Sequence, residues 1–217
     1  MTLPLPLRNR LAGLIVDSFH DAAARAGLAA IVALCDDPHA FDGEVPPRTF
    51  PDDLFTGSPE GLVVRRELRA HAAELCERAR RGWALVRARP LDRPDSPRTA
   101  ALEAAAALFD AGLYFETHEE LEPHWMQAAG AEREALQGLI QVAVGFQHLV
   151  NGNAAGARAL LHDGAAKLMV GTLAGVPLDG FAAGVSRCWQ SVVALGTNAP
   201  AAFDWSSVPR FPAAEGG

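Results

Sequence analysis

The chain has 217 residues, a formal net charge of −7, and a hydrophobic fraction of 49%. That fraction is sufficient for a buried core and is not typical of a disordered chain. Sequence-independent binding of nucleic acid depends on an excess of Lys and Arg that neutralises phosphates, and this chain lacks it. We therefore expect no nucleic-acid partner.

The sequence also predicts a cytoplasmic location. Its start lacks a basic stretch followed by an apolar run, and no stretch of about 18 consecutive apolar residues exists, so we expect neither a secretion signal nor a membrane span. The three cysteines, Cys35, Cys76 and Cys188, are far apart and form no CxxC pair. This pattern predicts buried free thiols in a reducing compartment rather than a disulfide scaffold or a thiolate zinc site.

The first part of the chain, residues 1–95, shows helical periodicity but no chemical motif. Apolar spacing predicts a helix over 8–35, interrupted at Gly27, followed by a proline-rich loop over 36–58. Ser58-Pro59 has the residue types of an N-cap and a first helical position, so we expect a second long helix from there to about residue 89.

The second part, residues 96–197, is predicted to hold a series of helices separated by Gly and Asn signals. These helices are expected over 97–110, 114–128, 132–150, 154–171 and 179–195. Because no strand pattern is present, the predicted fold class is all-α: an irregular bundle of antiparallel helices with a helical N-terminal extension. Residues 198–217 are interpreted as a C-terminal tail.

The expected helix over 114–128 carries the only pattern with a chemical signature. At about 100° per residue, His118 and Glu122 fall on the same side as the apolar stripe, whereas Glu116, Glu119 and Glu120 fall outside it. A buried imidazole or carboxylate needs a partner. A pair spaced i, i+4 can also direct two metal ligands, or two proton-transfer groups, at one point.

The next helix offers polar groups along one flank of its own apolar stripe. Gln137, Gln141 and His148 share that flank, and we expect them to face His118 and Glu122 across a short antiparallel connection. On the same helix, Gly138 and Gly145 would let a neighbouring helix approach closely.

Together these residues resemble a helical family of bacteria and archaea, domain-of-unknown-function family 309. The resemblance rests on the HxxxExxW signature, matched by His118, Glu122 and Trp125, on the Gln-Gly-Leu-Ile-Gln run at 137–141, and on Gly152-Asn153. It covers roughly residues 99–173. The signature implies metal binding but no established activity. This sequence places Pro123 inside the motif, where loss of a backbone N–H predicts a kink or a shifted register.

Several interpretations of the motif stay open at this point. In the first, His118, Glu122 and His148 bind a divalent metal ion, zinc or iron, with an open fourth position. In the second, Glu122 acts as a catalytic base with His118 as its partner and no metal takes part. In the third, His118 and Glu122 form a buried structural hydrogen-bond network within a helical protein-interaction module.

We expect five further residues to support the motif. The expected binding partner of the protein differs between the three interpretations. The supporting residues are Glu119, Trp125, Gln137, Gln141 and Tyr114. A small-molecule substrate of unknown identity suits the first two interpretations. A homodimer or a protein partner suits the third.

Overall fold

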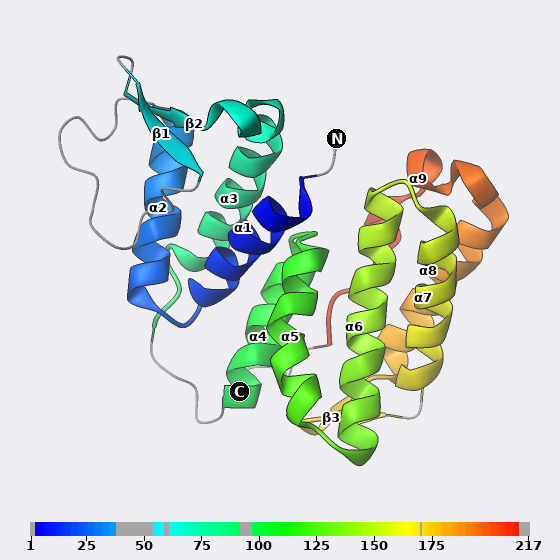
Figure 1. The fold of residues 1–217 in the computed structure, drawn as a ribbon. Helices are drawn as coiled ribbons and strands as arrows, with labels where there is room; N and C mark the ends of the chain where they lie inside the picture. The colour runs from blue at the N-terminus through cyan, green and yellow to red at the C-terminus, as the bar shows by residue number, and fades with distance from the viewer. Residues whose placement is uncertain (1–2, 38–53, 59–60, 92–96, 170, 213–217) are drawn as a thin grey trace. The chain divides into compact units, whose positions relative to one another are not determined.

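The computed structural model describes residues 3–37, 54–58, 61–91, 97–169 and 171–212 of the chain (Figure 1). Over these residues the fold is all-α, as predicted, with only two short antiparallel strand pairs. The chain divides into two compact units, Met1–Arg93 and Pro94–Gly217. Within the described residues, no helix has the length and apolar character needed to cross a membrane.

The first unit packs three helices and a β-hairpin. Its elements are α1 (Leu5–Asp17), α2 (Ala22–Asp36), β1 (Phe55–Ser58), β2 (Gly61–Val64), a 3₁₀ helix (Arg66–His71) and α3 (Ala72–Val86). The expected break at Gly27 is wrong, because Gly27 lies inside α2. The chain turns earlier, where the Asp21 side chain caps α2 by accepting a hydrogen bond from the Ala24 N–H.

The prediction of a helix starting at Ser58-Pro59 is also wrong. Ser58 ends β1, which pairs with β2 through contacts such as Thr56 with Val63, and the α-helix begins only at Ala72. The cap-plus-proline signal is local, whereas the pairing of β-branched residues such as Thr56 and Val63 depends on a partner strand. Most of the expected proline-rich loop, residues 38–53, lies outside the described residues.

A disulfide joins the two helices α2 and α3, which corrects the prediction of free thiols for two of the three cysteines. Cys35 and Cys76 are 41 positions apart in sequence, and their Cα atoms lie 5.7 Å apart. The Arg80 guanidinium reinforces this junction by donating to the Asp36 carboxylate and to the Cys35 carbonyl. Closing a loop of this length stabilises a domain by roughly 3–4 kcal/mol in the chain-entropy account.

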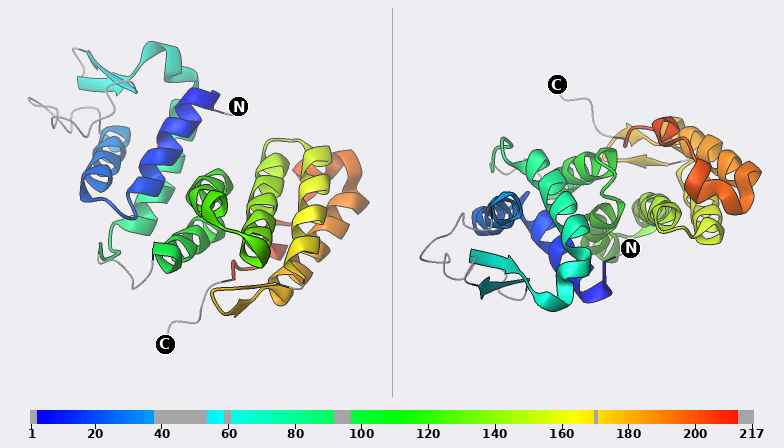
Figure 2. Two further views of the ribbon diagram at one scale, coloured as in Figure 1. Left: turned by 60° about the horizontal axis from the view of Figure 1, so that its bottom comes forward. Right: turned by 90° about the horizontal axis from the view of Figure 1, so that it is seen from above.

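The second unit is a layered helical bundle. Its elements are α4 (Pro97–Asp110), α5 (Tyr114–Gln127), α6 (Gly130–Val150), α7 (Ala154–Leu168), β3 (Thr172–Leu173), β4 (Val176–Pro177), α8 (Asp179–Leu195), α9 (Ala199–Ala202) and two 3₁₀ turns (Gly196–Asn198 and Trp205–Ser207). Successive helices pack side by side, and α6 lies between α5 and α7 (Figure 2).

Close packing of α6 on α7 depends on glycine. A Cβ added at Gly145 would lie 3.0 Å from the Leu161 side chain, and one at Gly164 would lie 2.9 Å from the Gly138 carbonyl oxygen. Gly138 and Gly145 therefore act as the sequence predicts, since α7 is the helix that approaches them.

An aromatic cluster forms the centre of this unit. The Phe109 ring lies 5.1 Å from Tyr114, 5.8 Å from Phe146 and 5.4 Å from Phe211, between ring centroids. Phe211 belongs to the segment interpreted from sequence as a tail, and its backbone N–H donates to the Asp110 carboxylate at 2.9 Å. Residues up to 212 thus complete the core, and 213–217 lie outside the described residues.

The cysteine arrangement predicts a specific thiol count. Cys188 is buried, and burial raises the pKa of its thiol above the usual value, so it should not react with a thiol reagent in the folded protein. For protein prepared in air without reductant, we expect no fast-reacting thiol when folded, one per chain after unfolding, and three after unfolding with reductant. Three thiols without reductant would contradict the disulfide.

Gly164 should be far less tolerant of a side chain than a glycine in open space. Gly164→Ala places the new Cβ against backbone atoms that cannot rotate away, so we expect the free energy of unfolding to fall by about 1–3 kcal/mol. Gly180 in α8 has no atom within 4 Å of its added Cβ, and Gly180→Ala should raise stability by up to about 1 kcal/mol. Urea unfolding of both variants measures the difference. An equal change in the free energy of unfolding in both variants would show that α7 does not approach α6 this closely at Gly164.

Candidate metal centre on helix α5

Helix α5 carries the polar cluster and continues through Pro123. Its first residue, Tyr114, follows a turn in which Gly112 has a φ of 72°, and the helix runs to Gln127. Pro123 has no N–H, so the carbonyl of Glu119, four residues earlier, loses its helical hydrogen bond. The helix is nevertheless continuous over the whole motif, and the local cost falls on the carbonyl of a residue in the cluster.

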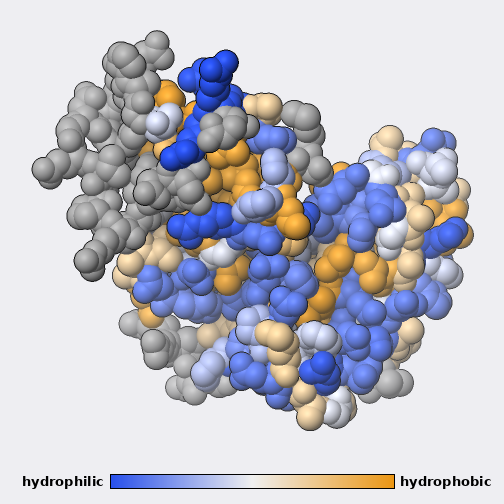
Figure 3. Space-filling view, viewed as in Figure 1, coloured by the Kyte–Doolittle hydropathy of each residue, from blue (hydrophilic) through white to orange (hydrophobic). Residues whose placement is uncertain are grey.

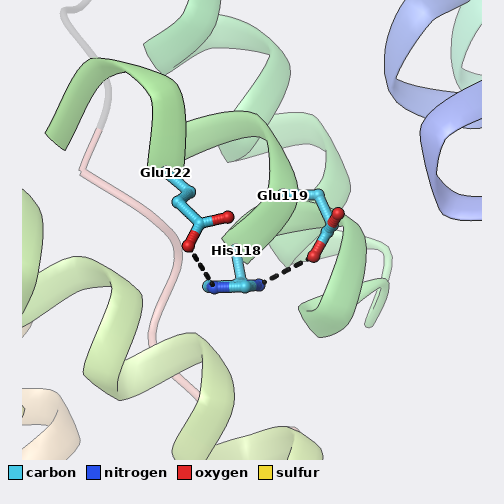
Figure 4. Close-up of side chains that lie close together, drawn as sticks. All are labelled: His118, Glu119 and Glu122. Carbon is cyan, nitrogen blue, oxygen red and sulfur yellow. Dashed lines mark ion pairs between the residues drawn. The ribbon is translucent and has the colours of Figure 1, made fainter. Parts of the chain in front are cut away.

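Three side chains of this helix converge. His118, Glu119 and Glu122 offer ligand atoms that all lie within 4.8 Å of one another, and within the described parts of the chain this is the only such group of three. The imidazole Nδ1 of His118 lies 3.1 Å from Glu119 Oε1, and its Nε2 lies 3.9 Å from Glu122 Oε1. Figure 4 shows the two carboxylates at opposite edges of the ring.

The cluster lies at the edge of the bundle rather than inside it. The side chains of His118 and Glu122 are 22% and 44% exposed. At 3.9 Å, the His118 and Glu122 atoms are too far apart for a hydrogen bond. The two residues therefore do not form the buried hydrogen-bonded pair of the third interpretation.

The buried glutamates of α5 are on its other side. Glu116 and Glu120 are 0% and 5% exposed, which corrects the expectation that they lie on an outer face. Within the second unit α5 packs against both α4 and α6, so a helical wheel with one inner stripe underestimates the buried part of this helix. Glu116 is about 200° from His118 around the helix axis, and it takes no part in the cluster.

His148 does not lie with His118 and Glu122. His148 is not among the residues whose ligand atoms converge, and since Ala128 and Ala129 join α5 to α6, Leu139 is level with His118 and His148 lies about 13 Å further along the antiparallel helix. His148 Nδ1 instead lies 3.0 Å from the Asn153 side-chain amide nitrogen. Asn153 in turn caps α7 by accepting from the Gly156 N–H at 2.9 Å, so His148 belongs to the corner between α6 and α7.

Gln137 and Gln141 lie on α6 before His148, close to the level of His118 along the helix axis. Both are half-buried on α6, and neither makes a hydrogen bond to His118 or Glu122 in the described structure. Gln141 is about 60° around the helix axis from Gly138, which faces α7, whereas Gln137 is only about 40° from Arg133, which contacts Trp125 of α5. That the two glutamines face His118 and Glu122 stays a prediction.

Trp125 and Tyr114 have structural places beside the cluster. Trp125 packs against the hydrophobic core, its carbonyl accepts from Arg133 at 2.7 Å, and the Arg133 guanidinium lies 4.2 Å from the centre of its ring. Tyr114 is buried in the aromatic cluster with Phe109 and Phe146. Trp125 therefore anchors α5 on α6, and Tyr114 anchors the start of α5 in the core.

Exposed hydrophobic residues do not gather on one element of the second unit. Those on its described surface are Met126, Val150, Met169, Val193 and Trp205, which belong to different segments. In the space-filling view, the same unit is mainly hydrophilic, with a small hydrophobic strip in the region of α6 (Figure 3). Scattered exposed hydrophobics are normal for a protein surface and indicate no particular partner.

The fold and the cluster define a helical bundle with a half-exposed histidine between two carboxylates on one helix. Residues 102–160 match the model of a family described as a domain of unknown function (DUF309), which confirms over this segment the resemblance seen in the sequence. The segment spans most of α4, all of α5 and α6, and the start of α7. The chain has no significant match among curated proteins or solved structures.

The capping role of Asn153 at the start of α7 can be tested by substitution. Asn153→Ala removes the side-chain cap of α7, so we expect the free energy of unfolding to fall by about 1 kcal/mol. Asn151→Ala is the matched control, because Asn151 only accepts an exposed hydrogen bond from Gln147. Chemical denaturation compares the two. An equal loss in both variants would contradict the capping role.

Proposed function

We propose that the protein binds a divalent transition-metal ion through His118 and Glu122, with Glu119 beside them. The observation that carries the proposal is the convergence of one imidazole and two carboxylates within one turn of helix, half-exposed to solvent. Imidazole nitrogen suits zinc, iron, copper and nickel, and carboxylate oxygen is an accepted ligand for zinc and iron. Zinc or iron is therefore the ion we expect.

The distances support a shared ion better than a direct pair. Around a tetrahedral zinc ion, with bonds of about 2.1 Å, ligand atoms lie roughly 3.4 Å apart. The His118–Glu122 separation of 3.9 Å is too long for a hydrogen bond and reaches the tetrahedral value by a small side-chain rotation. Neither residue satisfies the other, and an ion between them would satisfy both.

The exposure of the cluster also fits an ion that keeps open positions. Because the ligands come from one helix at the edge of the bundle, water or a substrate oxygen can fill the remaining positions. When bound, such an ion supplies Lewis-acid polarisation and lowers the pKa of a bound water. With fewer than three firm protein ligands, the site should bind more weakly than a catalytic zinc site built from three.

Metal content of tag-free protein tests the proposal. We expect about one zinc or iron ion per chain by elemental mass spectrometry after equilibrium dialysis against the metal, and loss of that ion in His118→Ala and Glu122→Gln, because each variant removes a ligand. Equilibrium titration with zinc measures the same loss as a weaker affinity.

Two histidine variants control for adventitious binding. His162 lies 3.0 Å from the adjacent Asp163, so it reproduces the His118–Glu119 pair, but Ala166 stands where Glu122 stands in the cluster. His162→Ala and His148→Ala should both keep the ion. A wild-type chain without stoichiometric metal, or equal loss in the control variants, would contradict the proposed site.

A further inference from the structure

Glu119 and Glu122 approach His118 from different directions because of their positions on the helix. Glu122, four residues on, is about 40° from His118 around the axis and one turn along it, whereas Glu119 is about 100° away at nearly the same height. Their carboxylates reach different ring nitrogens: Glu119 reaches Nδ1 and Glu122 reaches Nε2 (Figure 4). One ion bound to a single ring nitrogen therefore has only one of these carboxylates on its own side of the ring.

Burial distinguishes the two nitrogens. Nδ1 of His118 is enclosed and has no hydrogen-bond partner of good geometry, although Glu119 Oε1 lies only 3.1 Å away. Nε2 is not among the enclosed polar atoms, and it points toward Glu122, the more exposed of the two carboxylates. Of the two ring nitrogens, Nε2 is therefore the one that is not fully enclosed.

An imidazole that binds metal through Nε2 must carry its proton on Nδ1. An enclosed N–H needs an acceptor, because leaving it unpaired costs about 1–3 kcal/mol. Glu119 Oε1 is the carboxylate oxygen at this edge of the ring, and a small rotation of its side chain would align it with the N–H. Carboxylates in this position orient metal-binding histidines and increase the basicity of the ring.

We infer that Glu119 is a positioning residue and not a ligand: it holds the Nδ1–H of His118, so that Nε2 and Glu122 are presented to the ion. This inference rests on the proposed metal site. It assigns different roles to the two carboxylates, where proximity alone would make both of them ligands. It leaves the other coordination positions to solvent or substrate.

Cobalt(II) absorption separates a ligand from a positioning residue, because the visible bands of bound Co²⁺ report the atoms that coordinate it. With Glu119→Ala we expect the band shape of the wild type and an affinity for Co²⁺ that is roughly 10- to 100-fold weaker. Glu119→Gln, which keeps an uncharged acceptor, should recover part of that loss. Glu122→Gln should change or abolish the bands. Glu134→Gln, at a surface ion pair with Lys167, should resemble the wild type in both measurements.

A second measurement does not depend on metal. Nitrogen NMR of the metal-free protein reports which ring nitrogen of His118 carries the proton, and we expect Nδ1–H in the wild type and a shift toward Nε2–H in Glu119→Ala. A changed cobalt band shape in Glu119→Ala would make Glu119 a ligand and overturn the inference, as would an unchanged affinity and tautomer. Absence of cobalt binding in the wild type, with the expected tautomer shift, would refute the metal site and leave the contact between Glu119 and His118 established.

Discussion

The seating of α5 on α6 is the constraint on which the cluster depends. Pro123 removes one of the hydrogen bonds that would hold the last turns of α5, and Arg133 of α6 compensates by binding the Trp125 carbonyl and lying over the indole ring. Trp125 and His118 are seven residues apart, so they differ by only about 20° around the helix axis. Fixing Trp125 on α6 therefore also fixes the rotation at which one ring nitrogen of His118 is enclosed and the other is not.

The support for α6 comes from its other sides. Glycines allow α7 to approach along its length, and Phe146 places it in the aromatic cluster centred on Phe109. The chain returns to the same cluster at Phe211, which is tied to the end of α4 by Asp110. His118, Glu119 and Glu122 thus project from a helix whose neighbours are closely packed, and such a scaffold holds ligand geometry better than a loop would.

The sequence predicted what depends on local patterns and failed where a distant partner decides. The start of α4 at Pro97 and the turn at Gly152 follow from residue chemistry within a few positions, and so does the i, i+4 spacing of His118 and Glu122. The Cys35–Cys76 disulfide and the β1–β2 hairpin depend on which segments meet, and periodicity does not contain that information. His148 illustrates the same limit, because the sequence predicted that it faces α5, whereas its side chain lies beside Asn153 at the start of α7.

The exposure of His118 bears directly on why two carboxylates flank it. A buried, fully bonded network would contribute to stability and would need no ligand to explain it. An ion pair at 3.9 Å with side chains 22% and 44% exposed contributes little, since such pairs are typically worth about 0–1 kcal/mol. The His118–Glu122 pair therefore adds little to the stability of the fold. The enclosed Nδ1 of His118, which has no well-aligned hydrogen-bond partner, lowers the stability of the metal-free protein. In the proposed site a bound ion would offset that cost, because metal on Nε2 would require the proton on Nδ1, the nitrogen that lies 3.1 Å from Glu119 Oε1.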